Sequence, residues 1–400
     1  MASYYGYALS AADFAKEMRL FDLGRYFLKV FQRLTIEVQN IQRKQQVREI
    51  RWQSGLSLLS SLISSGIFIV VVLRAFSGGL SLGDVALYTS AVTVIQGALY
   101  GITYAIANVN ESTLFFTRYT DLLGWTQPIT IPSLSRPTPL LAGNVEFRDV
   151  SFRYSNEHPW ILRNLNLDLP AGQCLALVGL NGAGKTTLVK LLTRMYDSTE
   201  GSILWNGIDI REFDPIDLRR HMGVIFQDFM QFDLTAYENI AFGDISKLES
   251  SNQLAVEESV SRAANKAGLQ DLIARLPQGY HTVLSRWLVE DGQGVDLSGG
   301  EWQKIALARM FMRDADLLIL DEPTAALDAQ SECDIYSRFV KLVSGKTSLL
   351  ISHRFSTVRM ADRIAVLTDG EISEYGSHED LLSRGGVYAK LYEMQASMYK

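Results

Sequence analysis

Residues 179–186, GLNGAGKT, constrain the fold of this chain more than any other stretch. They fit the phosphate-binding pattern G-x-x-x-x-G-K-[ST], and they stand between an apolar run typical of a buried strand and an apolar-periodic helix. Glycines in such a loop let backbone N–H groups converge on phosphate oxygens, and the start of the helix adds a favourable field. A merely structural glycine turn would not need this strand and helix. The pattern predicts a nucleotide-binding α/β domain, with Lys185 reaching the β- and γ-phosphates and Thr186 ligating Mg²⁺.

The sequence LLILDEP supplies an acidic partner for that loop. Its apolar residues predict a central strand, and Asp321 follows at the carboxyl end of the strand, where ligands of open α/β sheets bind. Asp321 is therefore the candidate Mg²⁺ partner, directly or in the second sphere, and Glu322 the candidate general base for an attacking water. Two carboxylates that only cap the strand are the alternative, which the phosphate loop elsewhere in the chain disfavours.

The remaining pattern after residue 143 is that of an α/β domain. Short apolar runs such as CLALVGL and SLLIS predict strands buried on both faces of a mainly parallel sheet, separated by helices. Residues 246–290 are helical and charged, which predicts an inserted subdomain. Alternation around Asp369 and Gly370 predicts a β-hairpin. Cys174 and Cys333 lie in predicted core segments and show neither metal-ligand spacing nor a disulfide framework.

Two long uncharged runs distinguish the first third of the chain, and they predict membrane spans at about 52–74 and 85–110. Each is long enough to cross a bilayer as a helix, which takes about 20 residues, and a charge at mid-bilayer would cost about 2.5–3.5 kcal/mol. A pair of buried soluble helices is the alternative. The many serines of the first run leave that alternative open, although small polar residues also suit helix–helix contacts in lipid.

Residues 13–51 are predicted to be helical, with a possible break at Gly24, and basic residues crowd the entrance to the first span. The positive-inside rule places this helix in the cytoplasm. Residues 126–142 contain four prolines and predict an extended linker. A net charge of −6 gives no basic face for nucleic acid. The N-terminus lacks the basic and apolar regions of a signal peptide.

Residues 143 to about 395 resemble the ATP-binding cassette (ABC) transporters, of the exporter type that joins membrane helices to a cassette. The motifs occur in the family order: GLNGAGKT is similar to the Walker A motif, LLILDE to the Walker B motif and LSGGEWQ to the signature motif. Single residues also match family positions: Tyr154 the adenine-stacking aromatic, Gln227 the Q-loop, Asp328 the D-loop and His353 the switch histidine. Glu301 stands where many members have Gln.

The resemblance implies two substrates or cofactors, ATP and Mg²⁺, and a set of site residues. The implied catalytic residues are Glu322, His353, Gln227 and Lys185. The implied ATP-binding residues are Tyr154, Gly179, Asn181, Gly182, Ala183, Gly184, Lys185, Thr186, Thr187 and Gln227. The implied Mg²⁺ ligands are Thr186, Gln227 and Asp321.

The signature loop raises a separate question, because one triphosphate does not need two phosphate loops at the same end. Ser298, Gly299 and Gly300 precede a predicted helix whose N-terminus suits an anion. In the family, two cassettes meet head to tail, and the signature of one covers the γ-phosphate held by the other. The resemblance therefore implies a homodimer or heterodimer in which Ser298, Gly299, Gly300, Glu301 and Asp328 act in trans.

The resemblance also implies a domain order: a partial membrane domain at 1–125, the linker at 126–142 and the cassette at 143–400, with its helical subdomain at about 228–308. Residues 13–27 resemble the second intracellular coupling segment, and the two spans resemble the fifth and sixth of six helices. We therefore expect a truncated form, a gene fragment or a late start codon, rather than a natural short subunit. The expected setting is a bacterial cytoplasmic membrane, with the cassette in the cytoplasm and an unidentified cargo.

Two other functions compete with the exporter hypothesis. A stand-alone cassette ATPase shares the motifs but lacks membrane spans, and a non-enzymatic nucleotide-binding module would not need Lys185, Asp321, Glu322 and His353 intact. In the second span, Tyr88, Gln96, Tyr100 and Tyr104 either face a cargo cavity or pack against other helices, and packing is the commoner role of such residues.

Overall fold

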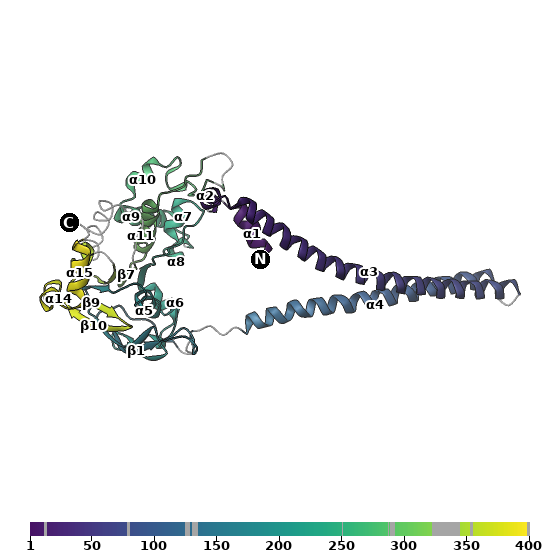
Figure 1. Cartoon of the computed structure of the whole chain (residues 1–400), viewed down its shortest axis with the longest axis horizontal. Coiled ribbons are helices and arrows are strands. Elements are labelled where there is room, and N and C mark those ends of the chain that lie inside the picture. Colours follow the sequence, from purple (N-terminus) through teal and green to yellow (C-terminus); the bar gives the residue numbers. More distant parts are fainter. Residues whose placement is uncertain are drawn as a thin grey trace. The chain divides into compact units, whose positions relative to one another are not determined.

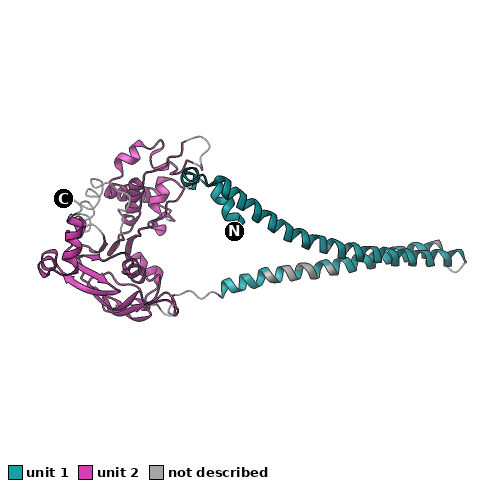
Figure 2. Ribbon diagram, viewed as in Figure 1, with its two compact units in different colours: residues 1–126 teal, residues 127–400 magenta. Residues whose placement is uncertain are grey.

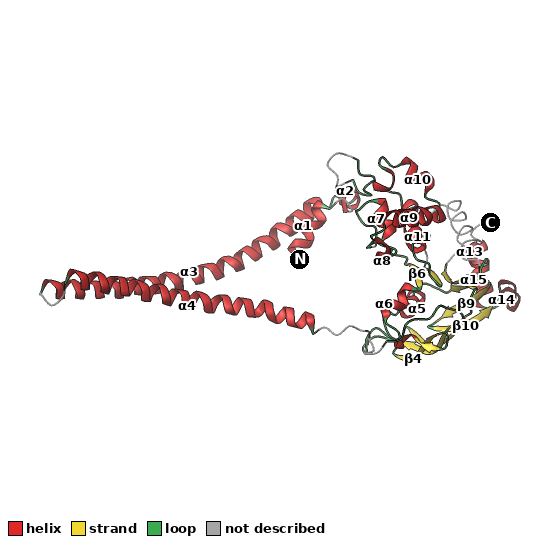
Figure 3. Cartoon of the chain, turned by 180° about the vertical axis from the view of Figure 1, so that it is seen from behind, coloured by secondary structure: helices red, strands yellow, loops and turns green. Residues whose placement is uncertain are grey.

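The computed structural model describes residues 1–11, 14–77, 81–124, 129, 135–249, 251–286, 288, 293–321, 345–352 and 355–397. The chain divides into two compact units, Met1–Thr126 and Gln127–Lys400 (Figure 2). The described residues of the first form helices, and those of the second form both helices and strands (Figure 3).

The first unit is built mainly from two long helices (Figure 1). Its helices are α1 (Ala2–Ser10), α2 (Ala15–Leu20), α3 (Gly24–Phe76) and α4 (Leu82–Leu123). The predicted break does occur near Gly24: Asp22 has a φ of 49°, a left-handed conformation that Asp tolerates better than most residues. Beyond it, the predicted cytoplasmic helix and the first span form one continuous helix of 53 residues, because no proline interrupts them. Helix α1 was not predicted.

The apolar residues of these helices are exposed. By length and composition, α3 and the segment Gly83–Ile102 are able to cross a membrane, and their most apolar windows are 6% and 0% buried. A core helix of a soluble protein would have most of that surface buried, so the alternative of two buried soluble helices has no support within this unit.

Helices α3 and α4 are joined by a polar contact within their apolar stretches. The side-chain amide of Gln96 donates to the Ser60 hydroxyl at 3.0 Å and also contacts the hydroxyl of Ser64. Gln96 and Tyr88 line a hollow of about 320 Å³ between the two helices, whereas Tyr100 is 54% exposed and lies outside it. Gln96 therefore serves helix packing, as interhelical amides do in membranes.

The second unit contains two sheets (Figure 3). The larger has the order β10-β9-β3-β8-β7-β6, and all its pairings are parallel except β9 with β10. Its strands are β3 (Cys174–Val178), β6 (Met222–Ile225), β7 (Leu317–Asp321), β8 (Thr347–Ile351), β9 (Arg363–Thr368) and β10 (Glu371–Gly376). The predicted, mainly parallel sheet is confirmed. The predicted hairpin is confirmed too: Asp369 and Gly370 have φ values of 51° and 86°, as a two-residue turn of this kind needs.

The smaller sheet is antiparallel and was not predicted. Its order is β2-β1-β4-β5, with β1 (Val145–Phe152), β2 (Leu162–Leu169), β4 (Glu200–Trp205) and β5 (Ile208–Asp209). The register of β1 shifts near Val150 against β2 and after Arg148 against β4. These irregularities break the inside–outside alternation by which such a strand is recognised.

Helices pack against the strands of this unit, and several of them form a helical region beside the larger sheet. The helices are α5 (Lys185–Leu192), α6 (Pro215–Arg220), α7 (Ala236–Ala241), α8 (Ile245–Leu248), α9 (Gln253–Ala267), α10 (Gln270–Arg275), α11 (Gly299–Phe311), α13 (Phe355–Val358), α14 (His378–Arg384) and α15 (Val387–Ser397). Short 3-10 turns lie at Ile210–Glu212 and Gly279–His281. Leu188 and Leu192 of α5 are fully buried in a core with strands of both sheets, so the packing fixes the start of α5. A second core holds α7, α9 and α11 together.

Candidate nucleotide site

The loop between β3 and α5 is the centre of the candidate site. Gly182 and Gly184 have φ values of 82° and 105°, which L side chains rarely adopt. A Cβ atom on Gly184 would lie 2.8 Å from a methyl group of Leu162, and one on Gly179 would lie 2.4 Å from the carbonyl oxygen of Leu367. Glycine at these positions therefore lets the loop fold tightly over the start of α5, with backbone N–H groups exposed to a ligand.

Lys185, the first residue of α5, has a buried side chain directed into this loop. Its ammonium group donates to the carbonyl oxygens of Gly179 at 2.9 Å and Leu180 at 3.1 Å. The side chain is only 6% exposed, so its charge is held close to the position where the loop amides converge. Carbonyl oxygens are weaker partners for an ammonium group than phosphate oxygens are, so this arrangement suits a polyphosphate.

A pocket of about 410 Å³ lies beside the loop. It brings together residues from three segments: Ile161 before β2, the loop and first turn of α5 including Thr186 and Thr187, and Gln227 after β6. Sequence reasoning predicted all of its lining residues except Ile161. An apolar residue that precedes a strand carries no distinguishing signal in a single sequence.

Asp321 provides a buried carboxylate on the neighbouring strand. It is the last residue of β7 and is fully buried, and β7 contacts α5. Buried carboxylates in proteins are paired or coordinate metals. Thr186 in the pocket offers a hydroxyl oxygen and Asp321, on the strand beside α5, offers carboxylate oxygens, which are ligand types that Mg²⁺ prefers. The residues present therefore fit a magnesium–phosphate group.

Tyr154 lies two residues beyond β1 and is held against α5. Its hydroxyl is 3.2 Å from the Thr187 hydroxyl, and its ring makes edge contacts with Phe152 and Tyr196 at centroid distances of 5.0 and 5.3 Å. These contacts orient the ring, yet Tyr154 remains 42% exposed. An oriented, exposed aromatic ring next to a phosphate loop is a suitable platform for a nucleobase.

The signature loop at 298–301 forms the N-terminal cap of α11. Ser298 caps α11: its hydroxyl accepts from the Glu301 N–H at 3.4 Å and donates to the Glu301 carboxylate at 2.8 Å. Arg275 of α10 lies 2.9 Å from that carboxylate. Burial raises the pKa of Glu301, but hydrogen bonds from Ser298 and the Arg275 charge outweigh it and hold this pKa below its usual range. Arg275 was not predicted, since no local pattern links α10 to α11.

The structure does not bring the two loops into one pocket. Among the described residues that line the Lys185 pocket, none belongs to 298–301. Gly299 and Gly300 form the first turn of α11, so their N–H groups are free of intrahelical partners there. Glu322, Asp328, His353 and Cys333 lie outside the described residues.

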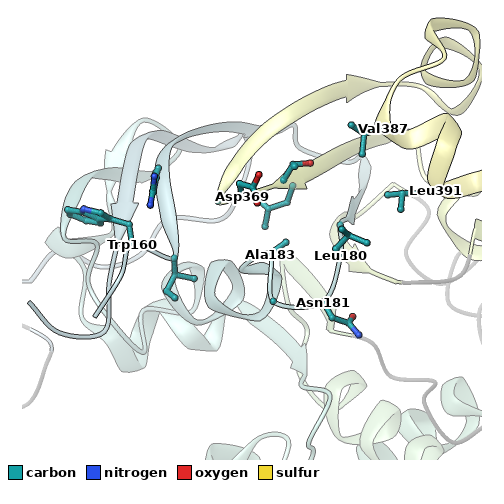
Figure 4. A pocket seen from close by; sticks show the side chains of 14 residues that line it. Trp160, Leu180, Asn181, Ala183, Asp369, Val387 and Leu391 are labelled. Atoms are coloured by element: carbon teal, nitrogen blue, oxygen red, sulfur yellow. The ribbon is translucent and has the colours of Figure 1, made fainter. Parts of the chain in front are cut away.

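A larger hollow, about 650 Å³, lies against the same loop (Figure 4). Trp160, Asn181, Asp369 and Leu391 are among the side chains that line it. Its lining includes neither Lys185 nor Thr186, so the groups suited to phosphate chemistry belong to the smaller pocket.

Comparison with known proteins is consistent with this geometry. The model of the family described as ABC transporter matches residues 162–325. The subtilin transport ATP-binding protein SpaT of Bacillus subtilis is 34% identical over 407 residues, which cover 99% of this chain and 63% of that protein. The ATP-dependent lipid A-core flippase of Escherichia coli K12 is 44% identical over 253 residues, or 63% of this chain and 41% of the flippase.

A solved structure shows the same fold. The structure of a bacterial Atm1-family ABC exporter with ATP bound has a TM-score of 0.84 and 30% sequence identity, over 96% of this chain and 64% of that one. The chain thus spans about two fifths to just under two thirds of the length of these relatives.

Residues 162–325 carry the domain of the ABC transporter family, and the similarity to SpaT and to the Atm1-family exporter extends over nearly all of the chain. Within that family its fold is that of an Atm1-type exporter, in which a helical region precedes a nucleotide-binding cassette.

Proposed function

We propose that this chain binds ATP with Mg²⁺, hydrolyses it, and couples the reaction to export across a membrane. The observation that carries the proposal is the pocket at the start of α5. There Lys185 and Thr186, at the start of α5, meet Gln227, which follows β6, beside the strand that ends in the buried Asp321. The proposed domains are the helical region at 1–125, the linker at 126–142 and the cassette at 143–400, with its helical subdomain at about 228–308.

Each residue of the proposed site has a distinct role. The ammonium group of Lys185 exchanges the loop carbonyls for β- and γ-phosphate oxygens, and the N-terminus of α5 adds N–H donors. Tyr154 stacks on the adenine. A magnesium ion held by Thr186, Gln227 and Asp321 would neutralise charge on the phosphates. Catalysis then depends mainly on positioning and electrostatics.

The remaining parts of the reaction are proposed from the sequence. Glu322 orients and deprotonates the attacking water, and His353 contacts the γ-phosphate. The 298–301 loop and Asp328 act on a nucleotide held by a second subunit, which is a copy of this chain or a relative. Because ATP would bind the closed pair more tightly than the open one, binding can move attached helices and hydrolysis can release them.

The proposed setting is a bacterial cytoplasmic membrane. The segments able to cross it are α3 and Gly83–Ile102, whose apolar surfaces are exposed. Exposed apolar helices of this length need acyl chains or other helices around them. Residues 13–27, which include α2, are the proposed coupling segment to the partner's cassette.

The experiment measures phosphate release by the full chain in detergent, as a function of ATP and of protein concentration. Lys185→Ala and Glu322→Gln are each expected to abolish hydrolysis, whereas Lys390→Ala, on the exposed side of α15, is the matched control and should not. Glu322→Gln should also accumulate an ATP-bound dimer, seen by light scattering.

Three results would contradict the proposal. Specific activity that does not change with protein concentration would exclude a shared site. Full activity in Glu322→Gln would remove the assigned base. A chain that remains soluble and active without detergent would favour a stand-alone cassette ATPase instead.

A further inference from the structure

Four basic residues of α3 stand immediately before its apolar stretch. Arg43, Lys44, Arg48 and Arg51 occupy two to three turns, and all four are exposed. Together with Val47 and Trp52, they line a shallow hollow of about 660 Å³. We call these four residues the basic cluster.

Four basic residues within nine positions concentrate positive charge on this part of α3. None of the ion pairs that the described residues form involves any of its four members. In the cassette, by contrast, exposed Arg148 and Arg211 each lie within hydrogen-bond distance of a carboxylate. The basic cluster is therefore available to an external anion.

The apolar surface that continues from the cluster lies on the same side of the helix. Residues four, three and four positions apart share a helix face, and Trp52, Leu56, Leu59 and Ile63 follow this spacing directly after Arg48. All four are more than half exposed. From Arg51 to Ile63 the helix rises about 18 Å at 1.5 Å per residue, a little more than half of the roughly 30 Å hydrocarbon core of a bilayer.

We propose that the basic cluster and this apolar stripe form a binding site for one anionic phospholipid of the leaflet on the cassette side. The phosphodiester would lie on Arg48 and Arg51, and an acyl chain would follow the stripe. The inference rests on the proposed insertion of α3 into a membrane. It goes beyond hydrolysis and transport, because it assigns a regulatory or structural lipid rather than a cargo.

The chemistry favours a lipid over other anions. The planar guanidinium groups of Arg48 and Arg51 suit bidentate contact with a phosphodiester, while Lys44 adds a point charge. Trp52 is a residue type enriched at the level of the headgroups. A nucleic acid or a free phosphate would contact the basic cluster and leave the apolar stripe exposed, whereas a phospholipid would contact the cluster with its headgroup and the stripe with an acyl chain.

The test titrates short-chain lipids onto the full chain in neutral detergent and follows tryptophan fluorescence. Dioctanoyl phosphatidylglycerol is the anionic probe, dioctanoyl phosphatidylcholine the zwitterionic probe, and inorganic phosphate the headgroup probe at equal ionic strength. Each basic residue near an anionic surface contributes roughly a fivefold factor in affinity. The double variant Arg48→Gln/Arg51→Gln is therefore expected to bind phosphatidylglycerol about 25-fold more weakly.

A matched control lies on the same helix. Lys29 and Arg33 are exposed and four residues apart, and Arg33 is about 22 Å along the helix from Arg48 at 1.5 Å per residue. Lys29→Gln/Arg33→Gln should leave the lipid affinity unchanged. Equal binding of both lipids, or an equal loss in both double variants, would overturn the proposal. Phosphate that competes as well as phosphatidylglycerol would show a free-anion site and overturn it too.

The same samples separate this inference from the proposed function. Phosphate release is measured beside the titration for the unmodified chain and for both double variants. Loss of selective lipid binding with hydrolysis intact refutes only the lipid site. Selective lipid binding by a chain that does not hydrolyse ATP supports the lipid site and contradicts the proposed function.

Discussion

The role of Ser298 can be separated into a structural and a catalytic part by three substitutions at the same position. In the structure its side chain caps α11, through the Glu301 N–H and carboxylate. In the proposed function the same hydroxyl faces the γ-phosphate of another subunit's ATP. Ser298→Ala removes the cap, Ser298→Asn keeps a neutral cap, and Ser298→Asp keeps a cap but adds a negative charge.

The variants are expected to rank differently in stability and in hydrolysis rate. Loss of a Ser cap to Ala costs about 1 kcal/mol, whereas Asn caps about as well as Ser. An Asp at this position would face the Glu301 carboxylate, which Ser298 contacts at 2.8 Å, so the comparison of stability uses Ala and Asn. For a unit of this size, about 1 kcal/mol corresponds to a decrease of roughly 2 °C in the melting temperature. A carboxylate about 4 Å from a phosphate oxygen is repelled by about 4 kcal/mol at an effective dielectric constant of about 20. If only one third of that energy is added to the activation free energy, the hydrolysis rate already falls about tenfold.

The assay pairs thermal unfolding with phosphate release for the full chain in detergent. Trp302 is buried in α11 four residues after Ser298, so its fluorescence reports on the capped helix. The melting temperature should be lower for Ser298→Ala than for Ser298→Asn, and the hydrolysis rate should be lowest for Ser298→Asp. Parallel rankings, with Ser298→Asp stable and fully active, would show that this residue acts only as a helix cap and would refute the shared site.

Three further predictions concern the cassette. Tyr154→Ala should raise the KM for ATP roughly 5- to 150-fold, since stacking on a base contributes about 1–3 kcal/mol. Tyr154→Phe keeps the ring and should stay near the original KM; equal KM values for the two variants would contradict the stacking role. Gly179→Ala should lower stability by about 1–3 kcal/mol, measured by thermal unfolding, because its Cβ would lie 2.4 Å from the Leu367 carbonyl oxygen; an unchanged melting temperature would refute this. The Thr138 N–H donates to the Asp217 carboxylate at 2.7 Å and lowers the pKa of Asp217. The ionised carboxylate therefore stabilises the folded state at neutral pH, and this contribution is lost as the pH falls below about 5. Asp217→Asn should make the melting temperature less sensitive to acid.

Local patterns in the sequence predicted much of the site. The glycine loop, the turn at Asp369 and Gly370, and the parallel strands each depend on residues adjacent in the chain, and the structure contains all three. The predicted helix after Ser298 is also present, and its start is a capping box formed by Ser298 and Glu301. Backbone dihedral preferences and periodicity act over a few residues, so a single sequence carries this information.

Tertiary structure decided the features that depend on distant residues. In the antiparallel sheet, β1 pairs with β2, which precedes α5 in the sequence, and with β4, which follows it. Shifts of register in β1 break the alternation of buried and exposed residues by which a strand is predicted. Ile161 enters the pocket, and Arg275 reaches Glu301, only because packing brings separate segments together. The sequence by itself determined the glycine loop and the helix start that we propose to hold a polyphosphate, because those features are local. Which other side chains surround that loop was decided by long-range packing, whose partners no local pattern specifies.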